Sequence, residues 1–262
     1  MRMVIKFAGA LLEQPLEAIA QQVADLVHQG HELLVIHGGG RTFTATLARL
    51  GIESRFVAGL RVTGRETRDV AVMVLGGLLN TRLAAAISAA GQSAIGVTAG
   101  DAGCLRARPL LTPPALGFVG ELTGVNAPFF QSLWNAGLVP VAACLGLGDD
   151  GELYNINADQ MAAAAAEYLS AERLIYLTDV AGVLDGANVL ETIECDQLEA
   201  LVAAGTVSGG MVLKLEASRR ALLAGVGEVR IVGGEIPGGL FAAASGQNAG
   251  TRVVAPVPVR RT

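Results

Sequence analysis

Short apolar runs alternate with helical patterns along most of the chain. Residues 33–36 form an uninterrupted apolar run, which is typical of a parallel strand buried on both faces. Comparable runs predict further strands at 4–7, 94–97, 138–142, 174–177, 229–232 and 252–255. Helical spacing of apolar residues predicts helices at 15–27, 43–50, 66–90, 127–136, 158–169, 195–204 and 211–224. This alternation predicts an α/β fold, a three-layer αβα sandwich around one continuous, mostly parallel sheet.

Two segments depart from a simple strand–helix alternation. The long helical pattern at 66–90 has an apolar stripe made of Val70, Val74, Leu78, Leu79 and Leu83. Residues 100–124 break into short alternating pieces interrupted by three prolines, which favours hairpins. Neither segment resembles a flexible linker. One sheet whose two halves bind different ligands is therefore expected.

Composition and charge exclude several classes of partner. The mean hydropathy of +0.48 raises the question of a membrane protein. However, the apolar stretch at 136–147 contains Pro140 and is shorter than the roughly 20 residues of a spanning helix. The net charge is −5 and no basic run occurs, which argues against nucleic acid. We expect neither a membrane nor a nucleic acid as partner.

The cysteines and the first residues of the chain indicate its compartment. Cys104, Cys144 and Cys195 are far apart and form no C-x-x-C pair, as expected for reduced thiols. The first nine residues have neither the apolar length nor the small-residue cleavage site of a signal peptide. These features predict a cytoplasmic protein.

Lysine is rare in this chain. Of its 19 basic residues only two are lysines, Lys6 and Lys214. Where arginine serves as the general surface cation, a retained lysine suits a role that needs a compact point charge, such as binding a phosphoryl oxygen. Chance is the alternative explanation.

Three loops at predicted strand ends or helix starts carry candidate chemistry. The glycines of 37–40 (HGGG) lie between a strand and a helix, where bare amides can approach an anion, although a tight turn explains them equally well. The segment 155–159 (NINAD) precedes an alanine-rich helix, and helix capping explains only one of its three Asx residues. Residues 208–211 precede a helix with Lys214 just inside it, which favours an anion site. Neither a P-loop motif nor a dinucleotide-binding fingerprint is present.

Taken together, these loops resemble the acetylglutamate kinases of the amino acid kinase family. The resemblance rests on the segments 6–9 (KFAG), 37–40 (HGGG), 59–63 (GLRVT), 155–159 (NINAD), 178–185 (TDVAGVLD) and 208–214 (SGGMVLK). It implies ATP-dependent phosphorylation of the γ-carboxylate of N-acetyl-L-glutamate in arginine biosynthesis, with Mg²⁺ accompanying ATP. It also implies a lobe at 1–170 for acetylglutamate binding and dimerisation, and a lobe at 171–262 for ATP.

The resemblance also assigns roles to individual residues. It implies that Lys6 and Lys214 stabilise the transferring phosphoryl group and that Asp159 holds both lysines. It implies substrate binding by Gly39, Gly40, Arg61, Asn155 and Asn157. It implies nucleotide binding by Gly9, Asp179, Val180, Ala181, Gly182, Val183, Leu184, Thr206, Val207 and Ser208. Protein ligands for a metal are not implied.

One position departs from the family pattern, and two other functions stay open. Ala8 replaces the first glycine of the first loop, and alanine disfavours positive φ. The alternatives are another family member acting on a related acyl amino acid or phosphate, and a non-catalytic sensor of the arginine pathway.

The resemblance further bears on assembly. Family members inhibited by arginine are hexamers linked by a helix ahead of the first strand, and only Met1 and Arg2 precede that strand here. We therefore expect a homodimer, formed through the helix at 66–90, whose activity is indifferent to arginine.

Overall fold

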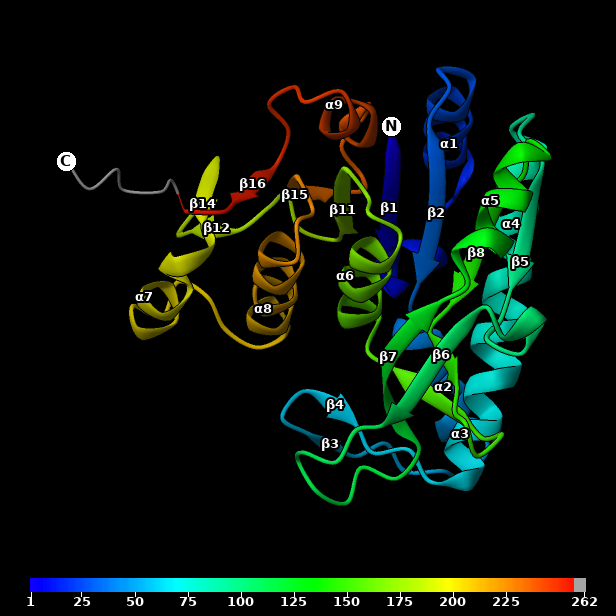
Figure 1. Cartoon of the computed structure of the whole chain (residues 1–262). Helices are drawn as coiled ribbons and strands as arrows, with labels where there is room; N and C mark the ends of the chain where they lie inside the picture. The colour runs from blue at the N-terminus through cyan, green and yellow to red at the C-terminus, as the bar shows by residue number, and fades with distance from the viewer. Residues whose placement is uncertain (257–262) are drawn as a thin grey trace.

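An eight-stranded sheet forms the core of the computed structural model, which describes residues 1–256 (Figure 1). In spatial order its strands are β14 (Thr192–Glu194), β16 (Thr251–Val254), β15 (Glu228–Gly233), β11 (Arg173–Thr178), β1 (Arg2–Phe7), β2 (Glu32–His37), β8 (Val139–Ala143) and β5 (Ala94–Val97). All neighbouring pairs from β15 to β5 are parallel, and β16 is antiparallel to β15. The predicted continuous, mostly parallel sheet is confirmed.

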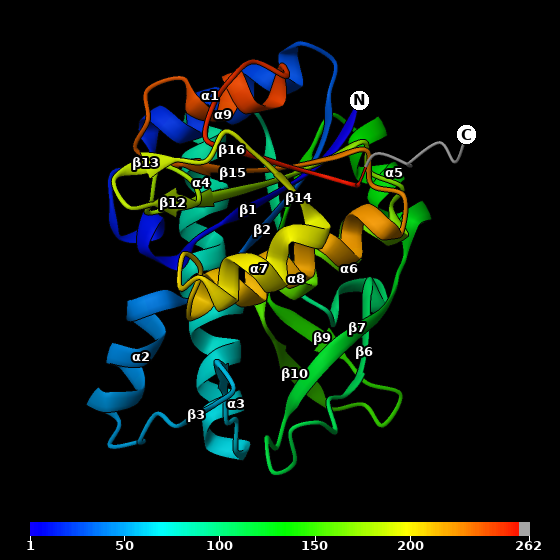
Figure 2. The same ribbon diagram turned by 90° about the vertical axis from the view of Figure 1, so that its left-hand side faces the viewer.

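Helices cover both faces of this sheet. Figure 2 shows the strands between α1 (Glu17–His28) with α9 (Gly239–Ala244) on one side and α6 (Ala158–Tyr168) with α8 (Gly210–Leu223) on the other. Helix α4 (Asn80–Ala89) packs beside α1, and α5 (Ala127–Asn135) packs against β8. The alanines at 162–166 are all buried, and these small side chains let α6 lie close to both β1 and α8. The three-layer arrangement follows from this packing.

Smaller elements lie beside the main sheet. Strands β6 (Leu105–Pro109), β7 (Val119–Val125), β9 (Leu145–Leu147) and β10 (Leu153–Ile156) form a small closed barrel. Strands β6 and β7 are antiparallel, which confirms the hairpin predicted within 100–124. The sequence did not predict the hairpins β3 (Phe56–Val57) with β4 (Leu60–Arg61) and β12 (Leu184–Asp185) with β13 (Asn188–Val189), nor α9. The remaining short helices are η1 (Gly9–Glu13), α2 (Gly40–Arg49), η3 (Asp101–Gly103), η4 (Cys195–Gln197) and α7 (Leu198–Ala203).

The long helix at Arg65–Ala89 differs from its prediction in one respect. It consists of α3 (Arg65–Ala71), a π-helical segment η2 (Val72–Leu79) and α4. The wider π turns move the buried positions by one residue, so the apolar face continues from Val74 to Leu79 rather than to Leu78. Leu78 is 41% exposed, and its assignment to the buried stripe was wrong. The same shift turns Asn80 toward the core.

This helix also has the length and composition of a membrane span. Its apolar window has a mean hydropathy of 1.8, which the sequence analysis missed by considering only residues 136–147. Half of that window is buried inside the fold, where the helix packs on α1, β5 and β8. Core helices of globular proteins share these properties. The expectation that no membrane is involved stays a prediction.

Candidate functional site

Two lysines and one aspartate converge where the sheet meets the start of α6. Lys6 lies near the carboxyl end of the central strand β1, Asp159 is the second residue of α6, and Lys214 is the fifth residue of α8. The Nζ atoms of Lys6 and Lys214 lie 2.8 Å and 2.9 Å from the same atom, Oδ1 of Asp159. The three predicted catalytic residues are therefore in direct contact.

The charges of this triad are strongly coupled. Lys6 and Lys214 are 7% and 6% exposed, so little water screens them. Burial raises the pKa of Asp159, but the charges of both lysines together lower it by more. The pKa of Asp159 therefore lies below its ordinary value. Burial, together with the charge of Lys6, lowers the pKa of Lys214 to about 8. With both lysines protonated, the triad carries one net positive charge, which favours binding of an anion.

Tyr176 contacts both Lys214 and Asp159, and the sequence did not predict this residue. Its ring centroid lies 4.6 Å from Lys214 Nζ, and its hydroxyl donates to the carbonyl oxygen of Asp159 at 3.1 Å. It lies in β11, in register with Lys6 on β1. A tyrosine inside an otherwise apolar strand was the available signal, because a buried hydroxyl needs a partner.

Two glycine loops touch beside the triad. A Cβ atom added at Gly9 would lie 2.3 Å from the amide nitrogen of Gly40, so neither position has room for a side chain. Gly40 also has a φ of +47°, which favours glycine. Ala8 has a φ of −64°, an ordinary value for alanine. The concern that alanine disturbs this loop through positive φ was therefore wrong.

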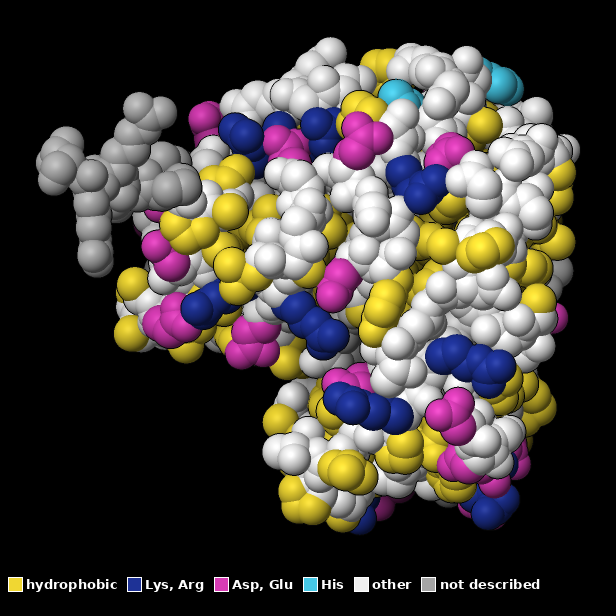
Figure 3. Space-filling model, viewed as in Figure 1, with side chains coloured by type: hydrophobic (Ala, Val, Ile, Leu, Met, Phe, Trp, Pro, Cys, Tyr) yellow, Lys and Arg dark blue, Asp and Glu magenta, His cyan; other side chains and the backbone are white. Residues whose placement is uncertain are grey.

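The two loops, Lys6 and Asp159 border one cavity of about 260 Å³. It is lined by Lys6, Gly9, Gly38, Gly39, Gly40, Phe43, Arg61, Leu75, Cys144, Asn155, Ile156, Asn157, Ala158 and Asp159. Every residue predicted to bind the acceptor substrate is in this set. Lys214 adjoins the cavity through Asp159. The face of the molecule is hollowed beneath α8, above the β3–β4 hairpin (Figure 3).

A tight hairpin presents Arg61 to the cavity. Its two-residue turn, Ala58 and Gly59, has positive φ at both positions, as type I′ turns require. The Arg61 guanidinium carbon lies 4.7 Å from the Phe43 ring centroid and 4.6 Å from that of Phe56. Its nitrogens donate to two hydroxyls, Ser54 Oγ at 2.6 Å and Thr44 Oγ1 at 2.8 Å.

The tip of the same hairpin reaches the other half of the chain. A Cβ atom added at Gly59 would lie 2.8 Å from Cδ1 of Leu213, so the turn packs directly on α8. Leu213 precedes Lys214 in that helix.

The side chains of the two predicted asparagines make different hydrogen bonds within the protein. Asn155 Nδ2 donates to Thr63 Oγ1 at 3.1 Å. Asn157 Oδ1 caps α6 by accepting from the amides of Asp159 and Gln160. The capping explanation therefore holds for Asn157, and the same residue also lines the cavity.

The predicted nucleotide-binding segments lie apart from this cavity. Residues 179–183 connect β11 to β12, which begins at Leu184, and residues 206–208 connect α7 to α8. Apart from Gly9, none of the predicted nucleotide-binding residues lines the cavity. The charge of Asp179 nonetheless acts on Lys214, where it opposes the lowering of the pKa. Residues 206–208 lie directly before α8, which carries Lys214, and Asp179 is near enough to Lys214 for its charge to act on it.

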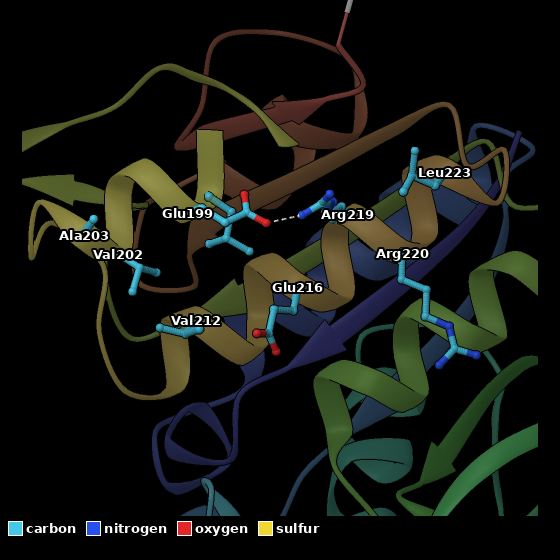
Figure 4. A pocket seen from close by; sticks show the side chains of 9 residues that line it. Glu199, Val202, Ala203, Val212, Glu216, Arg219, Arg220 and Leu223 are labelled. Carbon is cyan, nitrogen blue, oxygen red and sulfur yellow. Dashed lines mark hydrogen bonds and ion pairs between the residues drawn. The ribbon is translucent and has the colours of Figure 1, made fainter. Parts of the chain in front are cut away.

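A larger cavity, of about 640 Å³, lies between α7 and α8 (Figure 4). Apolar side chains such as Val202, Val212 and Leu223 line it, and the Glu199–Arg219 ion pair closes one side. It contains none of the triad residues. Lys6 and Asp159 line the smaller cavity instead.

Comparison with known proteins agrees with this geometry. Residues 1–233 match the profile of the Amino acid kinase family. The chain belongs to that family. Two proteins with similar sequences are both named acetylglutamate kinase. The one from Koribacter versatilis is 52% identical, over 88% of this chain and 90% of its own; the one from Acidobacterium capsulatum is 47% identical, over 90% and 92%.

A solved structure supports the family fold. A protein from Streptococcus mutans UA159 superposes with a TM-score of 0.87 and 27% identity, over 97% of this chain and 99% of its own. The family match and the names of the relatives place this family member among the acetylglutamate kinases.

Proposed function

We propose that this kinase transfers the γ-phosphoryl group of ATP to the γ-carboxylate of N-acetyl-L-glutamate, giving N-acetylglutamyl 5-phosphate and ADP in arginine biosynthesis. The observation that carries the proposal is the pair of lysines on one aspartate oxygen, beside a cavity that holds an arginine. The names and high coverage of its relatives support the choice of acceptor.

The residues suit phosphoryl transfer between two oxyanions. The acceptor is already an ionised carboxylate, so no general base is needed, and catalysis depends on positioning and charge neutralisation. Lys6 and Lys214 would neutralise the charge on the transferring group, and Asp159 would fix their separation. The amides of Gly39 and Gly40 begin α2, where the first-turn N–H groups lack acceptors within the helix. They would donate to the reacting oxygens.

Arg61 and Asn155 would bind the rest of the acceptor. A guanidinium binds both oxygens of a carboxylate, which suits the α-carboxylate of acetylglutamate. The two aromatic rings on Arg61 fix its plane before the substrate arrives. Asn155 and the side-chain amide of Asn157 would supply polar contacts.

ATP and Mg²⁺ would bind on the side of α8. Residues 179–184 and 206–208, with Gly9, would contact the nucleotide, which assigns 171–262 to ATP and 1–170 to the acceptor. Within residues 1–256 no group of three His, Cys, Asp or Glu side chains could hold a metal. Mg²⁺ would therefore be held chiefly by phosphate oxygens and water. When bound, it would neutralise phosphate charge.

The long helix at Arg65–Ala89 would form a homodimer interface. Its π segment exposes Met73 at 59% and Leu78 at 41%, and a second copy of the same face would cover both. Light scattering of the proposed dimer should give a molecular mass of about twice 26.8 kDa. The Leu78→Glu variant should give the mass of one chain. A monomeric parent protein would contradict the proposed interface.

The test of function is an acceptor panel. Purified enzyme with Mg-ATP should form a hydroxamate from N-acetylglutamate and hydroxylamine, and little from free glutamate. Preference for another acyl amino acid or a phosphate would favour the second family activity. ATP binding without turnover on any acceptor would favour a sensor.

A further inference from the structure

A buried polar pair lies behind the glycine loop, outside the cavity. His37 ends β2 and is fully buried, and Asn80 begins α4 and is 3% exposed. Asn80 Nδ2 lies 3.2 Å from His37 Nε2 and 2.8 Å from the carbonyl oxygen of Val141. His37 Nδ1 lies 3.2 Å from the carbonyl oxygen of Gly38. These contacts connect the long helix to the loop that would bind the reacting oxygens.

The contacts determine where the proton of the imidazole lies. The amide nitrogen of asparagine only donates hydrogen bonds, so His37 Nε2 must be the acceptor. A neutral imidazole then carries its proton on Nδ1, which donates to the Gly38 carbonyl. Burial lowers the pKa of His37 to about 4, which keeps the ring neutral at physiological pH.

This tautomer fixes the orientation of one peptide group. The carbonyl of Gly38 and the amide N–H of Gly39 belong to the same planar trans peptide and point in opposite directions. With the carbonyl held toward the imidazole, the Gly39 N–H points away from His37. On that side lies the cavity that Gly38 and Gly39 line.

The fold makes specific room for Asn80. The π segment moves the inward-facing positions by one residue, and this brings Asn80 to the core side of the helix. Gly96 in β5 leaves space for its side chain, because a Cβ atom there would lie 1.9 Å from Asn80 Oδ1. Together the π segment and Gly96 give Asn80 its place in the core beside His37.

We propose that His37, held in its Nδ1–H tautomer by Asn80, is a positioning residue that aims the Gly39 amide at the charge developing on the transferring phosphoryl group. This inference rests on the proposed function and adds a residue that acts through the loop rather than on the substrate.

Two variants that each keep one nitrogen position of the imidazole separate positioning from packing. In His37→Asn the side-chain NH₂ group takes the place of Nδ1 and can still donate to Gly38, whereas in His37→Gln it takes the place of Nε2. We expect His37→Asn to keep kcat within a few-fold of the parent. His37→Gln should lower kcat by roughly 10²-fold with little change in the KM for ATP, as for loss of one oxyanion donor.

Gln92→Leu provides the matched control. Gln92 is also buried, at 6% exposure, and donates to the carbonyl of Gly137 near the opposite end of β5. Its loss should lower the melting temperature and leave kcat unchanged. Equal loss of kcat in His37→Asn and His37→Gln would overturn the proposal.

A spectroscopic measurement tests the tautomer without any substrate. A long-range ¹H–¹⁵N spectrum of the parent protein should show one histidine with a protonated Nδ1 and an unprotonated Nε2, and that signal should vanish in His37→Asn. A protonated Nε2 would overturn the proposal even if no variant folds. Because this readout needs no acceptor, it is independent of whether acetylglutamate is the substrate.

Discussion

The ammonium groups of Lys6 and Lys214 meet at a single oxygen atom, Oδ1 of Asp159, although the two lysines come from opposite ends of the chain. One carboxylate thus sets the distance between two cations that would otherwise repel each other. Such a group acts as a unit, because each lysine depends on the same aspartate for its place. Its members are therefore expected to give non-additive effects when they are changed.

Replacing either lysine should slow the chemical step. We expect Lys6→Ala and Lys214→Ala each to lower kcat by roughly 10²–10³ with smaller changes in KM, since both charges act mainly in the transition state. The double variant should lose much less than the product of the two effects. Steady-state kinetics with ATP and N-acetylglutamate measures this.

Arginine should substitute poorly for either lysine. Its planar guanidinium is larger than an ammonium and cannot place one point charge 2.8–2.9 Å from Asp159 Oδ1 without moving the carboxylate. Near-parent turnover in Lys6→Arg or Lys214→Arg would contradict the role of that lysine.

Activity should decline at alkaline pH. The pKa of Lys214 is lowered to about 8, so its ammonium loses its proton as pH rises through that value. We expect kcat/KM, which reports the free enzyme, to fall above about pH 8. The residual activity of Lys214→Arg should lack this decline, because arginine stays protonated. A parent profile that is flat to pH 10 would exclude Lys214 as a required cation.

Arg61 should determine affinity for the acceptor alone. Its guanidinium would contact the α-carboxylate in both ground and transition states, so Arg61→Ala should raise the KM for N-acetylglutamate at least tenfold and leave the KM for ATP unchanged. Arg55, an exposed arginine ahead of the same hairpin, is the control, and Arg55→Ala should change neither KM. A shift in the KM for ATP would show that the role assigned to Arg61 is wrong.

Neighbouring positions in the first loop should respond oppositely to a single methyl group. Gly9→Ala places a Cβ atom 2.3 Å from Gly40 N and must separate the two glycine loops, so most activity should be lost. Ala8→Gly removes a methyl at a φ that either residue adopts, and activity should stay near that of the parent. Tolerance of Gly9→Ala would mean that the loops do not need their close contact for catalysis.

His37 should make stability depend on pH in the acid range. Its pKa falls from 6.5 in the unfolded chain to about 4 in the fold, so the unfolded chain binds more protons between these values. The free energy of unfolding should therefore rise from pH 4 to 6.5, by roughly 3 kcal/mol for this group, and be lost again on acidification. Urea titrations across this range should show that slope in the parent and a smaller slope in His37→Asn.

The pattern of apolar residues predicted the main strands of the sheet. The apolar run at 33–36 lies within β2, and residues 94–97 form β5 as predicted. The hairpin bearing Arg61 was missed, because its strands have only two residues each and no alternation to detect. The π segment was missed because the prediction assumed the 3.6-residue period of an α-helix throughout residues 66–90, whereas π turns are wider.

The candidate site was predictable where residue type alone carried information. Two lysines in an arginine-rich chain indicated the pair that Asp159 holds. The partners of the supporting residues were not predictable in this way. A tyrosine in an apolar strand indicates a buried hydroxyl but not its acceptor at Asp159, and Asn80 meets His37 only in the folded chain. For Asn157 helix capping and the predicted substrate binding are compatible, since the side chain that caps α6 also lines the cavity.

The contact between Gly59 and Leu213 has a consequence for how the two substrates bind. The hairpin that carries Arg61, proposed to bind the acceptor, rests on the helix that carries Lys214, proposed to bind the phosphoryl group. A substrate that strengthens this contact from one side would therefore favour the arrangement that the other substrate binds. Thermodynamic linkage then requires reciprocity: by whatever factor ATP tightens acceptor binding, the acceptor tightens ATP binding by the same factor.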